Sequence, residues 1–145
     1  MAVNLSDVKG ISIPEGEVKS ISDSNGNVLW QKITRVDLLA TCTKAGWRNA
    51  SNQISGNGTD PNWQYGDPVA INGQTKITCS VDGYTTVATI MYYRDNMSIL
   101  TYIKYTGGGV GRLNLTDDPI PNGAAYVAVC CHNQSKWTGQ SCYME

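Results

Sequence analysis

The chain has 145 residues, a formal net charge of −1 and 41% hydrophobic residues. This length is typical of a single domain with a real core, and no apolar run approaches the roughly 20 residues that a membrane-spanning helix needs. Nucleic-acid binding depends on clustered Lys and Arg, so this charge balance gives no argument for a nucleic-acid partner. The N-terminal MAVNLSDVKG lacks the basic and then apolar pattern of a signal peptide, so we expect synthesis in a cytoplasm.

The composition is unusual in its aromatic residues and its cysteines. Phenylalanine is absent, whereas the chain has eight tyrosines and four tryptophans, which suit a surface that is partly wet and partly apolar. Tyrosine is also simply a good strand residue. An odd number of cysteines without a secretion signal argues against a disulfide framework. We therefore expect most of them to be small buried hydrophobic residues on strands, namely Cys42, Cys79, Cys130, Cys131 and Cys142.

Residues 1–32 are predicted to form a small unit of their own, with three short strands in a β-meander over residues 8–32. The Asn25-Gly26 pair is the signal of a two-residue hairpin. Such a meander leaves an apolar face without a partner, which favours an attachment or assembly element. An ordinary N-terminal subdomain packed on the main body is the alternative. The apolar positions assigned to attachment are Ile11, Ile13, Val18, Ile21, Val28 and Trp30.

The segment ISIPEGEVKSISDSNGNVLWQK resembles a short N-terminal element of many phage-encoded virion proteins. The shared features are an opening of the form I-x-I-P-E-G-x-V-x-x-I and a close of the form x-N-G-x-V-L-W. The match covers about the first fifth of the chain, and its turn residues make it fairly specific. The resemblance implies attachment to a tail, baseplate or capsid component through residues 8–32.

Residues 33–145 are predicted to form a β-sandwich. Trp63–Val81 and Asp117–Cys131 share one pattern, in which a proline break and an Asn-Gly turn precede an alternating strand. Aligned on these turns, Ile77, Cys79 and Val81 match Val127, Val129 and Cys131. The two strands are therefore expected to form two walls of one core.

The other predicted elements follow from alternation and turn residues. We expect a strand from Val36 to Cys42 and a long polar surface loop over Ala45–Gln64. A turn is expected at Asp82-Gly83, and a hairpin loop at the glycine run Gly107–Gly111; a phosphate cradle there would need a following helix. Further strands are expected at Thr85–Tyr93, Ile99–Tyr105, Ala124–His132 and Ser141–Glu145. No segment has helical periodicity, so the predicted class is all-β with a jelly-roll-like antiparallel sandwich.

Residues 45–145 are similar to a jelly-roll module of phage tail and receptor-binding proteins that resembles carbohydrate-binding modules. The family carries an arginine after its Tyr-Val pair, where this chain has Ala128, so a role tied to that arginine does not transfer. The matching segments are Asp67-Pro68-Val69, Asn72-Gly73, Tyr92-Tyr93-Arg94-Asp95-Asn96 and Pro121-Asn122-Gly123-Ala124-Ala125-Tyr126-Val127.

Catalytic chemistry is hard to build from these residues. His132 is the only histidine, and on a strand it shares a face with Cys130 and not with Cys131. A metal site from Cys130, His132 and Cys142 lacks the spacing of paired ligands. Asp117 and Asp118 could serve as paired carboxylates for glycoside hydrolysis, but their place before a proline favours a turn. We therefore expect no enzyme activity, no cofactor and no metal.

Sugar binding has a more plausible set of residues, because flat aromatic faces stack on pyranose rings and amides bond to hydroxyls. The alternative for each tryptophan is that it closes one end of the sandwich. The candidate glycan-binding residues are Trp47, Trp63, Tyr65, Asn133 and Trp137.

These observations and the two resemblances predict a non-enzymatic phage virion protein, assembled in the host cytoplasm and displayed on the particle surface. The expected partners are other virion proteins, two further copies of the chain in a trimer, and host polysaccharide, without membrane insertion. A ligand-free decoration protein is the first alternative. A glycan depolymerase is the second.

Overall fold

The computed structural model describes residues 20–31, 33–56, 60–133 and 138–145. The chain divides into two units, residues 1–34 and residues 35–145. The described residues form strands and one 3₁₀ turn, Leu39–Thr41, which confirms the predicted all-β class.

The described part of the first unit is an antiparallel hairpin of β1 (Ser20–Ser22) and β2 (Val28–Gln31). The predicted two-residue turn is wrong, because the connection runs from Asp23 to Asn27. The Asp23 carboxylate accepts hydrogen bonds from the backbone N–H groups of Asn25 and Asn27, which stabilises this longer turn. The predicted strand at Ile11–Ile13 lies outside the described residues.

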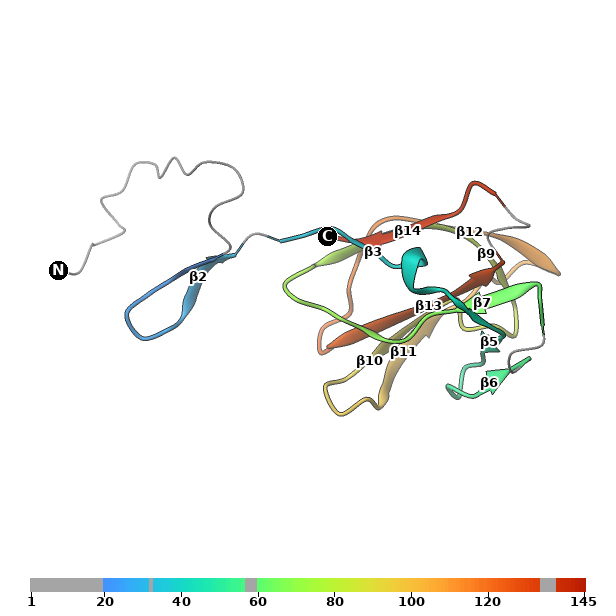
Figure 1. Cartoon of the computed structure of the whole chain (residues 1–145), viewed down its shortest axis with the longest axis horizontal. Helices are drawn as coiled ribbons and strands as arrows, with labels where there is room; N and C mark the ends of the chain where they lie inside the picture. Colours follow the sequence, from blue (N-terminus) through green and yellow to red (C-terminus); the bar gives the residue numbers. More distant parts are fainter. Residues whose placement is uncertain (1–19, 32, 57–59, 134–137) are drawn as a thin grey trace. The chain divides into compact units, whose positions relative to one another are not determined.

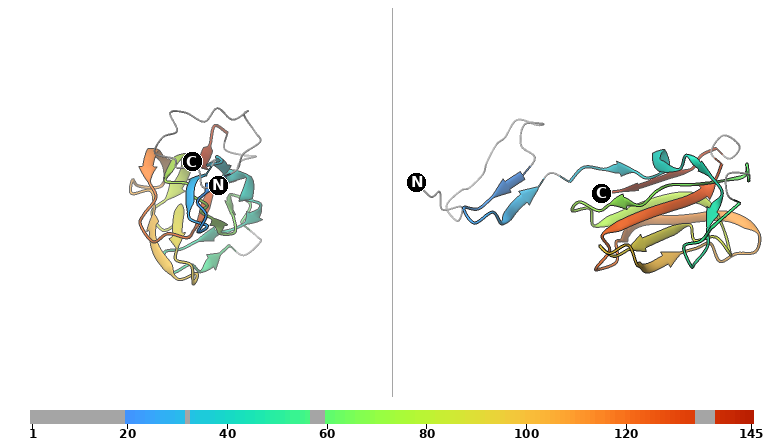
Figure 2. Two further views of the ribbon diagram at one scale, coloured as in Figure 1. Left: turned by 90° about the vertical axis from the view of Figure 1, so that its left-hand side faces the viewer. Right: turned by 60° about the horizontal axis from the view of Figure 1, so that its bottom comes forward.

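The second unit consists mainly of two antiparallel sheets (Figures 1 and 2). The first sheet has the order β11-β10-β13-β7-β4, with β8 also paired to β13, and the second has the order β12-β9-β14-β3. Their bounds are β3 (Val36–Asp37), β4 (Lys44–Ala45), β7 (Trp63–Tyr65), β8 (Val69–Ala70), β9 (Lys76–Tyr84), β10 (Ile90–Tyr93), β11 (Ile99–Ile103), β12 (Val110–Pro119), β13 (Tyr126–His132) and β14 (Ser141–Met144).

The chain crosses repeatedly between the two sheets. Going along the chain, β9 lies in the second sheet, β10 and β11 in the first, β12 in the second, β13 in the first and β14 in the second. Apart from β10 and β11, neighbouring strands within each sheet are not consecutive in the chain. The predicted antiparallel β-sandwich is confirmed.

The main core lies between the two sheets. Ile77, Cys79 and Val81 of β9 belong to one buried cluster with Val127, Val129 and Cys131 of β13. This cluster confirms the prediction that the two strands with matching turns form two walls of one core. The alternation of side chains along each strand directs these residues inward.

The cysteines are only partly as expected. All five are buried, but Cys79 of β9 and Cys142 of β14 lie directly opposite each other and form a disulfide. The expectation of unpaired cysteines is therefore wrong for these two. Sequence spacing could not reveal the pair, because only the strand register brings positions 63 residues apart into contact. Cys42, Cys130 and Cys131 are free and buried, as expected.

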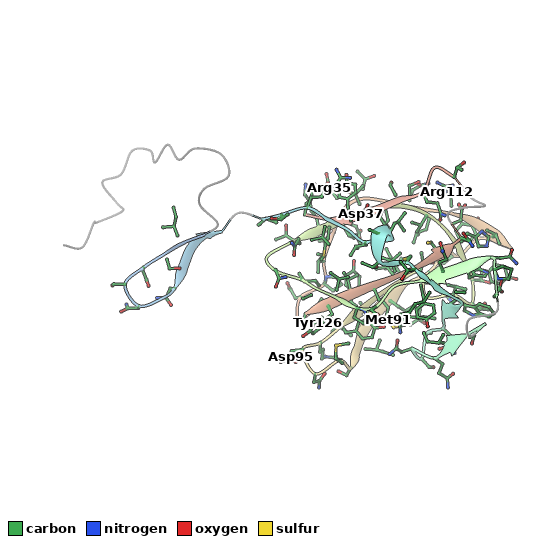
Figure 3. All side chains as sticks on the ribbon, viewed as in Figure 1. Arg35, Asp37, Met91, Asp95, Arg112 and Tyr126 are labelled. Carbon is green, nitrogen blue, oxygen red and sulfur yellow. A yellow bond between two sulfur atoms is a disulfide. The ribbon has the colours of Figure 1, made fainter. Side chains whose placement is uncertain are left out.

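The outer face of the first sheet is covered as well. Met91 and Tyr93 of β10 form a second buried cluster with Ala88 and Ala128, and Tyr126 packs against it (Met91 and Tyr126 are labelled in Figure 3). The cover is a hairpin of β5 (Trp47–Arg48) and β6 (Ile54–Ser55), called here the β5–β6 hairpin. The Ala88 N–H donates a hydrogen bond to the Arg48 carbonyl, which joins this hairpin to the residues just before β10.

The predicted long surface loop over Ala45–Gln64 is therefore wrong where the β5–β6 hairpin packs on the sheet. Several of its polar residues bond to one another, while Ser51 and Gln53 remain exposed. The Asn52 side-chain oxygen accepts hydrogen bonds from both Arg48 and the Tyr93 hydroxyl, at 2.9 and 2.7 Å.

Two strand boundaries differ from the prediction because of aspartates. The strand expected from Val36 to Cys42 ends at Asp37, whose carboxylate accepts the backbone N–H groups of Leu39 and Ala40 and so starts the 3₁₀ turn. The turn expected at Asp82-Gly83 lies inside β9, where Asp82 is opposite Arg112.

Gly83 allows close packing within β9 and does not form a turn. A Cβ atom on Gly83 would lie 2.5 Å from Thr89 Oγ1, so β9 needs glycine there. The strand expected over Thr85–Tyr93 is correspondingly shortened to β10. The glycine run after β11 is a loop but not a hairpin, because β11 and β12 belong to different sheets.

The adjacent tyrosines of β10 give a stability prediction. Tyr92 points into the main core, where its hydroxyl has no hydrogen-bond partner among the described residues, whereas the Tyr93 hydroxyl donates to Asn52. Because an unpaired buried hydroxyl is costly, Tyr92→Phe should raise the free energy of unfolding by about 1 kcal/mol. Tyr93→Phe, the matched control, should lower it by about 1 kcal/mol. Urea unfolding measures both, and a destabilised Tyr92→Phe variant would contradict the prediction.

Candidate ligand-binding site

An aromatic cluster lies on the outer face of the first sheet. Trp63 of β7 is 9% exposed and packs with Val87 and with Cys130 of β13. Three partly buried aromatic residues pack around this centre, namely Trp47, Tyr65 and Tyr84. The cluster thus brings together the β5–β6 hairpin, β7, the end of β9 and β13.

A pocket of about 230 Å³ opens beside this cluster, lined by Trp47, Trp63, Tyr84, Thr86, Val87 and Val110. Three of these six residues are aromatic and two are valines, so the walls are mostly apolar. Hydroxyl groups of Tyr84 and Thr86 and the indole N–H groups are the polar side-chain groups in the lining. Val110 is 47% exposed and Thr86 is exposed, while Val87 is buried.

Local backbone geometry positions Trp47. The indole lies over Gly56, which has φ +69°, and a Cβ atom at Gly56 would lie 2.5 Å from the ring. Glycine is therefore required at this place, both for its positive φ and for the close approach of the ring. The next residue, Arg48, is buried, and its Nη2 donates to the Gly66 carbonyl at 3.0 Å. Its guanidinium lies 5.1 Å from the Tyr65 ring centroid.

His132 supports the aromatic cluster from β13. Its ring meets Trp63 edge to face, with centroids 4.1 Å apart. His132 shares this side of β13 with Cys130, whereas Cys131 faces the main core, as predicted from strand alternation. Burial lowers the pKa of His132 below its usual value of 6.5, and the negative charges of Asp82 and Asp60 only partly oppose that shift.

This lowered pKa makes stability depend on pH. The folded state holds the neutral ring, so the stabilising contribution is complete above about pH 6.5, the pKa in the unfolded chain. It is lost as the pH falls through the lower folded pKa. We expect urea unfolding to show lower stability at pH 5 than at pH 7.5, with a weaker pH dependence in His132→Gln.

Because the chain has a single histidine, one NMR titration gives the folded pKa of His132 directly. A value above 6.5 would contradict the burial argument.

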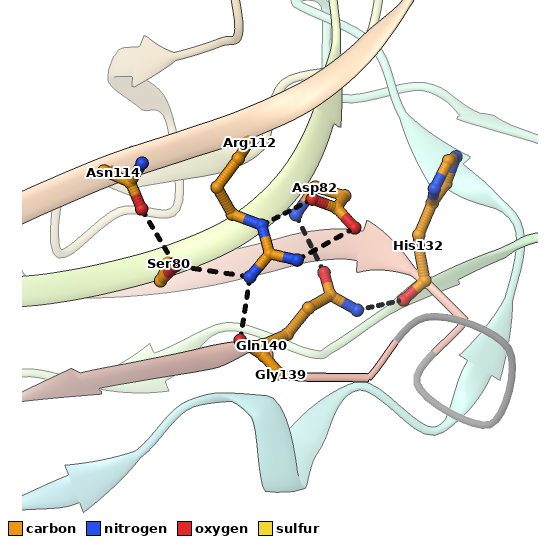
Figure 4. Close-up of polar contacts among 7 residues, drawn as sticks. All are labelled: Ser80, Asp82, Arg112, Asn114, His132, Gly139 and Gln140. Atoms are coloured by element: carbon orange, nitrogen blue, oxygen red, sulfur yellow. Dashed lines mark hydrogen bonds and ion pairs between the residues drawn. The ribbon is translucent and has the colours of Figure 1, made fainter.

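A polar network lies next to the cluster and ties the two sheets together (Figure 4). Asp82 is 8% exposed, and its carboxylate accepts hydrogen bonds from Arg112 Nε and Nη2, at 2.6 and 3.3 Å. The Gln140 side chain accepts the Asp82 N–H and donates to the His132 carbonyl, so it bridges β9 and β13. Arg112 Nη1 also donates to the Gly139 carbonyl at 2.7 Å. The network therefore holds the strand that carries His132.

Four of the five candidate glycan-binding residues come together. Trp47, Trp63 and Tyr65 lie in the aromatic cluster, and Asn133 adjoins it at the end of β13, where its side-chain amide donates to the Pro61 carbonyl at 2.8 Å. Trp63 largely closes the sheet end, which was the alternative for each tryptophan, although it still lines the pocket. Trp137 lies outside the described residues.

Of the attachment residues, Ile21 lies on β1 and is half-buried, and Val28 and Trp30 belong to β2. Ile11, Ile13 and Val18 lie outside the described residues.

Four residues of the pocket lining were not predicted from the sequence, namely Tyr84, Thr86, Val87 and Val110. The strand predicted from the alternation of Ile77, Cys79 and Val81 could have been extended to Tyr84. The predicted turn at Asp82-Gly83 ended it too early. Val110 carries no local signal, because it reaches the pocket through the pairing of β12 with β9, where it lies opposite Tyr84. Thr86 and Val87 follow the end of β9.

One of the two carboxylates considered for glycoside hydrolysis, Asp117, has a structural partner. Asp117 lies at an irregularity in the pairing of β12 with β9, with φ +50°, and forms an ion pair with Lys76 at 3.0 Å. Within residues 20–31, 33–56, 60–133 and 138–145, no cluster of three His, Cys, Asp or Glu side chains could hold a metal ion. No helix among these residues is long and apolar enough to cross a membrane.

Comparison of the chain with protein-family models, with curated proteins and with solved structures found no match.

Proposed function

We propose that the protein is a non-enzymatic phage virion protein that is displayed on the particle surface and contacts host glycans through the aromatic pocket. The observation that carries this proposal is the pocket lined by Trp47, Trp63 and Tyr84 beside the sheet end. Residues 8–32 attach the protein to other virion components, and three copies assemble.

The pocket chemistry supports a saccharide ligand. Indole and phenol rings offer flat apolar faces to the C–H faces of a pyranose, and hydroxyl groups at the rim satisfy sugar hydroxyls. Thr86 is exposed and Tyr84 is partly buried, so both can supply such a group. A purely apolar ligand would leave these hydroxyls without a role.

The first unit supports the attachment part of the proposal. Among the described residues β1 pairs with β2 alone, and a hairpin of two strands is at best marginally stable in water, so it needs a further packing partner. The attachment segment is also the part whose motif resembles elements of phage virion proteins. We assign its partner to the particle for that reason.

Binding of purified host cell-wall polysaccharide tests the proposal. We expect Trp47→Ala to weaken binding at least tenfold, which corresponds to about 1.4 kcal/mol. The matched control is Tyr102→Ala, an exposed aromatic residue on β11 that does not line the pocket. Thermal unfolding checks that both variants fold.

Three results would contradict the proposal. The wild-type protein could fail to bind any host polysaccharide, which would favour a ligand-free decoration protein. Tyr102→Ala could weaken binding as much as Trp47→Ala, which would place the ligand elsewhere. Release of reducing ends from the polysaccharide would identify a depolymerase instead.

A further inference from the structure

We infer that the aromatic pocket accepts one uncharged pyranose unit and discriminates against acidic sugars. This inference rests on the proposed function, because it names the class of sugar that the same site takes. It follows from two properties of the pocket, its size and the charges around it.

The size limits the ligand to a single ring. The pocket measures about 230 Å³, below the roughly 300 Å³ at which pockets for drug-sized ligands begin. Trp47 and Trp63 come from different strands, β5 and β7, and both line this one small space. A longer glycan would therefore place one unit inside and its remaining units in water.

The described lining carries no charge. Trp47, Trp63, Tyr84, Thr86, Val87 and Val110 are all neutral, so the described lining offers no cation to a uronic acid or a phosphate. An anion that loses water in such a place without a partner is strongly disfavoured. A neutral sugar loses only hydroxyl hydration, which the rim hydroxyls replace.

Two carboxylates act on a residue that contacts the cluster. Asp60 and Asp82 both act electrostatically on His132, whose ring contacts Trp63 at the base of the cluster. The two arginines of this region donate hydrogen bonds to other groups of the protein. Arg112 is paired with Asp82, and Arg48 is 7% exposed and bonded to Asn52 and Gly66.

Matched sugar pairs test the inference. The full chain is titrated with the methyl glycosides of glucose, galactose and mannose and with the corresponding uronic acids at pH 7, each pair differing in one carboxylate. The readout is the NMR signal of the tryptophan indole N–H groups. We expect at least one neutral glycoside to shift the Trp47 signal, which is assigned by its loss in Trp47→Ala. Its uronic counterpart should bind at least tenfold more weakly.

A gain-of-function variant completes the design. Thr86 is exposed and lines the pocket, so T86K adds a cation without disturbing the core. We expect T86K to strengthen uronic acid binding at least fivefold while the neutral partner changes less. T86V, which removes the hydroxyl and adds no charge, should not strengthen uronic acid binding.

The outcomes separate the inference from the proposed function. If a uronic acid binds as well as its neutral partner, or if no neutral monosaccharide shifts the Trp47 signal, the inference is wrong. The proposed function still stands in either case, provided that the wild-type protein binds host polysaccharide and Trp47→Ala does not. Loss of polysaccharide binding altogether would overturn both.

Discussion

The double variant Cys79→Ala/Cys142→Ala is expected to unfold with a free energy about 4 kcal/mol lower than the wild-type protein. The disulfide joins β9 to β14 across 63 residues of sequence, and a cross-link of that span strongly restricts the unfolded chain. Both residues also belong to the main core, so their small side chains leave little cavity when replaced by alanine. Urea unfolding under non-reducing conditions measures the difference.

Two measurements make this prediction specific. The denatured, unreduced protein should present three free thiols, from Cys42, Cys130 and Cys131, and five after reduction. Cys130→Ala, which removes a buried thiol but no cross-link, should cost only about 1 kcal/mol. Five thiols before reduction would show that the disulfide is absent, and the double variant would then resemble the control.

Replacing Arg48 with alanine is expected to lower the free energy of unfolding by about 3 kcal/mol. The Arg48 guanidinium bonds to the buried Gly66 carbonyl and to Asn52, which also accepts the Tyr93 hydroxyl. Its loss leaves these acceptors with fewer donors and uncovers the outer face of the first sheet. Arg48→Lys should cost nearly as much, because an ammonium group cannot reproduce the planar fork of donors.

We expect Arg48→Ala to loosen the β5–β6 hairpin without opening the two sheets. Hydrogen exchange should show faster exchange in residues 47–55 of Arg48→Ala, with β9 and β14 protected as in the wild type. Uniformly faster exchange across both sheets would contradict the role assigned to Arg48 as the anchor of the β5–β6 hairpin. Lys44→Ala is a suitable control, since it removes an exposed ion pair with Asp67 and should change stability by less than about 1 kcal/mol.

The main core could be predicted because its signals are local. Asn72-Gly73 and Asn122-Gly123 each precede an alternating apolar strand, and Gly73 and Gly123 both adopt positive φ, at +87° and +84°. Such turns depend on the residues themselves and hardly on the surroundings. The register of each strand then follows from which face is apolar.

The misplaced elements depend on partners that are distant in sequence. Asp82-Gly83 has the composition of a turn, but Arg112 pairs with Asp82 and Thr89 packs on Gly83, which keeps both residues in β9. The β5–β6 hairpin is polar because Asn52 and Arg48 satisfy buried groups of the first sheet. Neither partner is visible from local sequence.

In the candidate site, too, some residues have local sequence signals and others depend on distant strand pairing. Trp47, Trp63 and Tyr65 could be singled out as aromatic residues within a polar stretch, and the structure groups them. Tyr84 and Val110 reach the pocket because β9 and β12 pair at its edge, where Val110 lies opposite Tyr84. That pairing is a property of the sheet, so composition alone could not identify these two residues.

The strand order has a consequence for synthesis. β13 lies between β10 and β7 in the first sheet, and β14 lies between β9 and β3 in the second (Figure 1). Both central strands are thus encoded after the strands that flank them. The β10–β11 and β9–β12 pairs can form earlier, but neither sheet can complete its pairing before residues 126–144 are synthesised. We therefore expect the domain to close late in synthesis, with strand edges exposed until then.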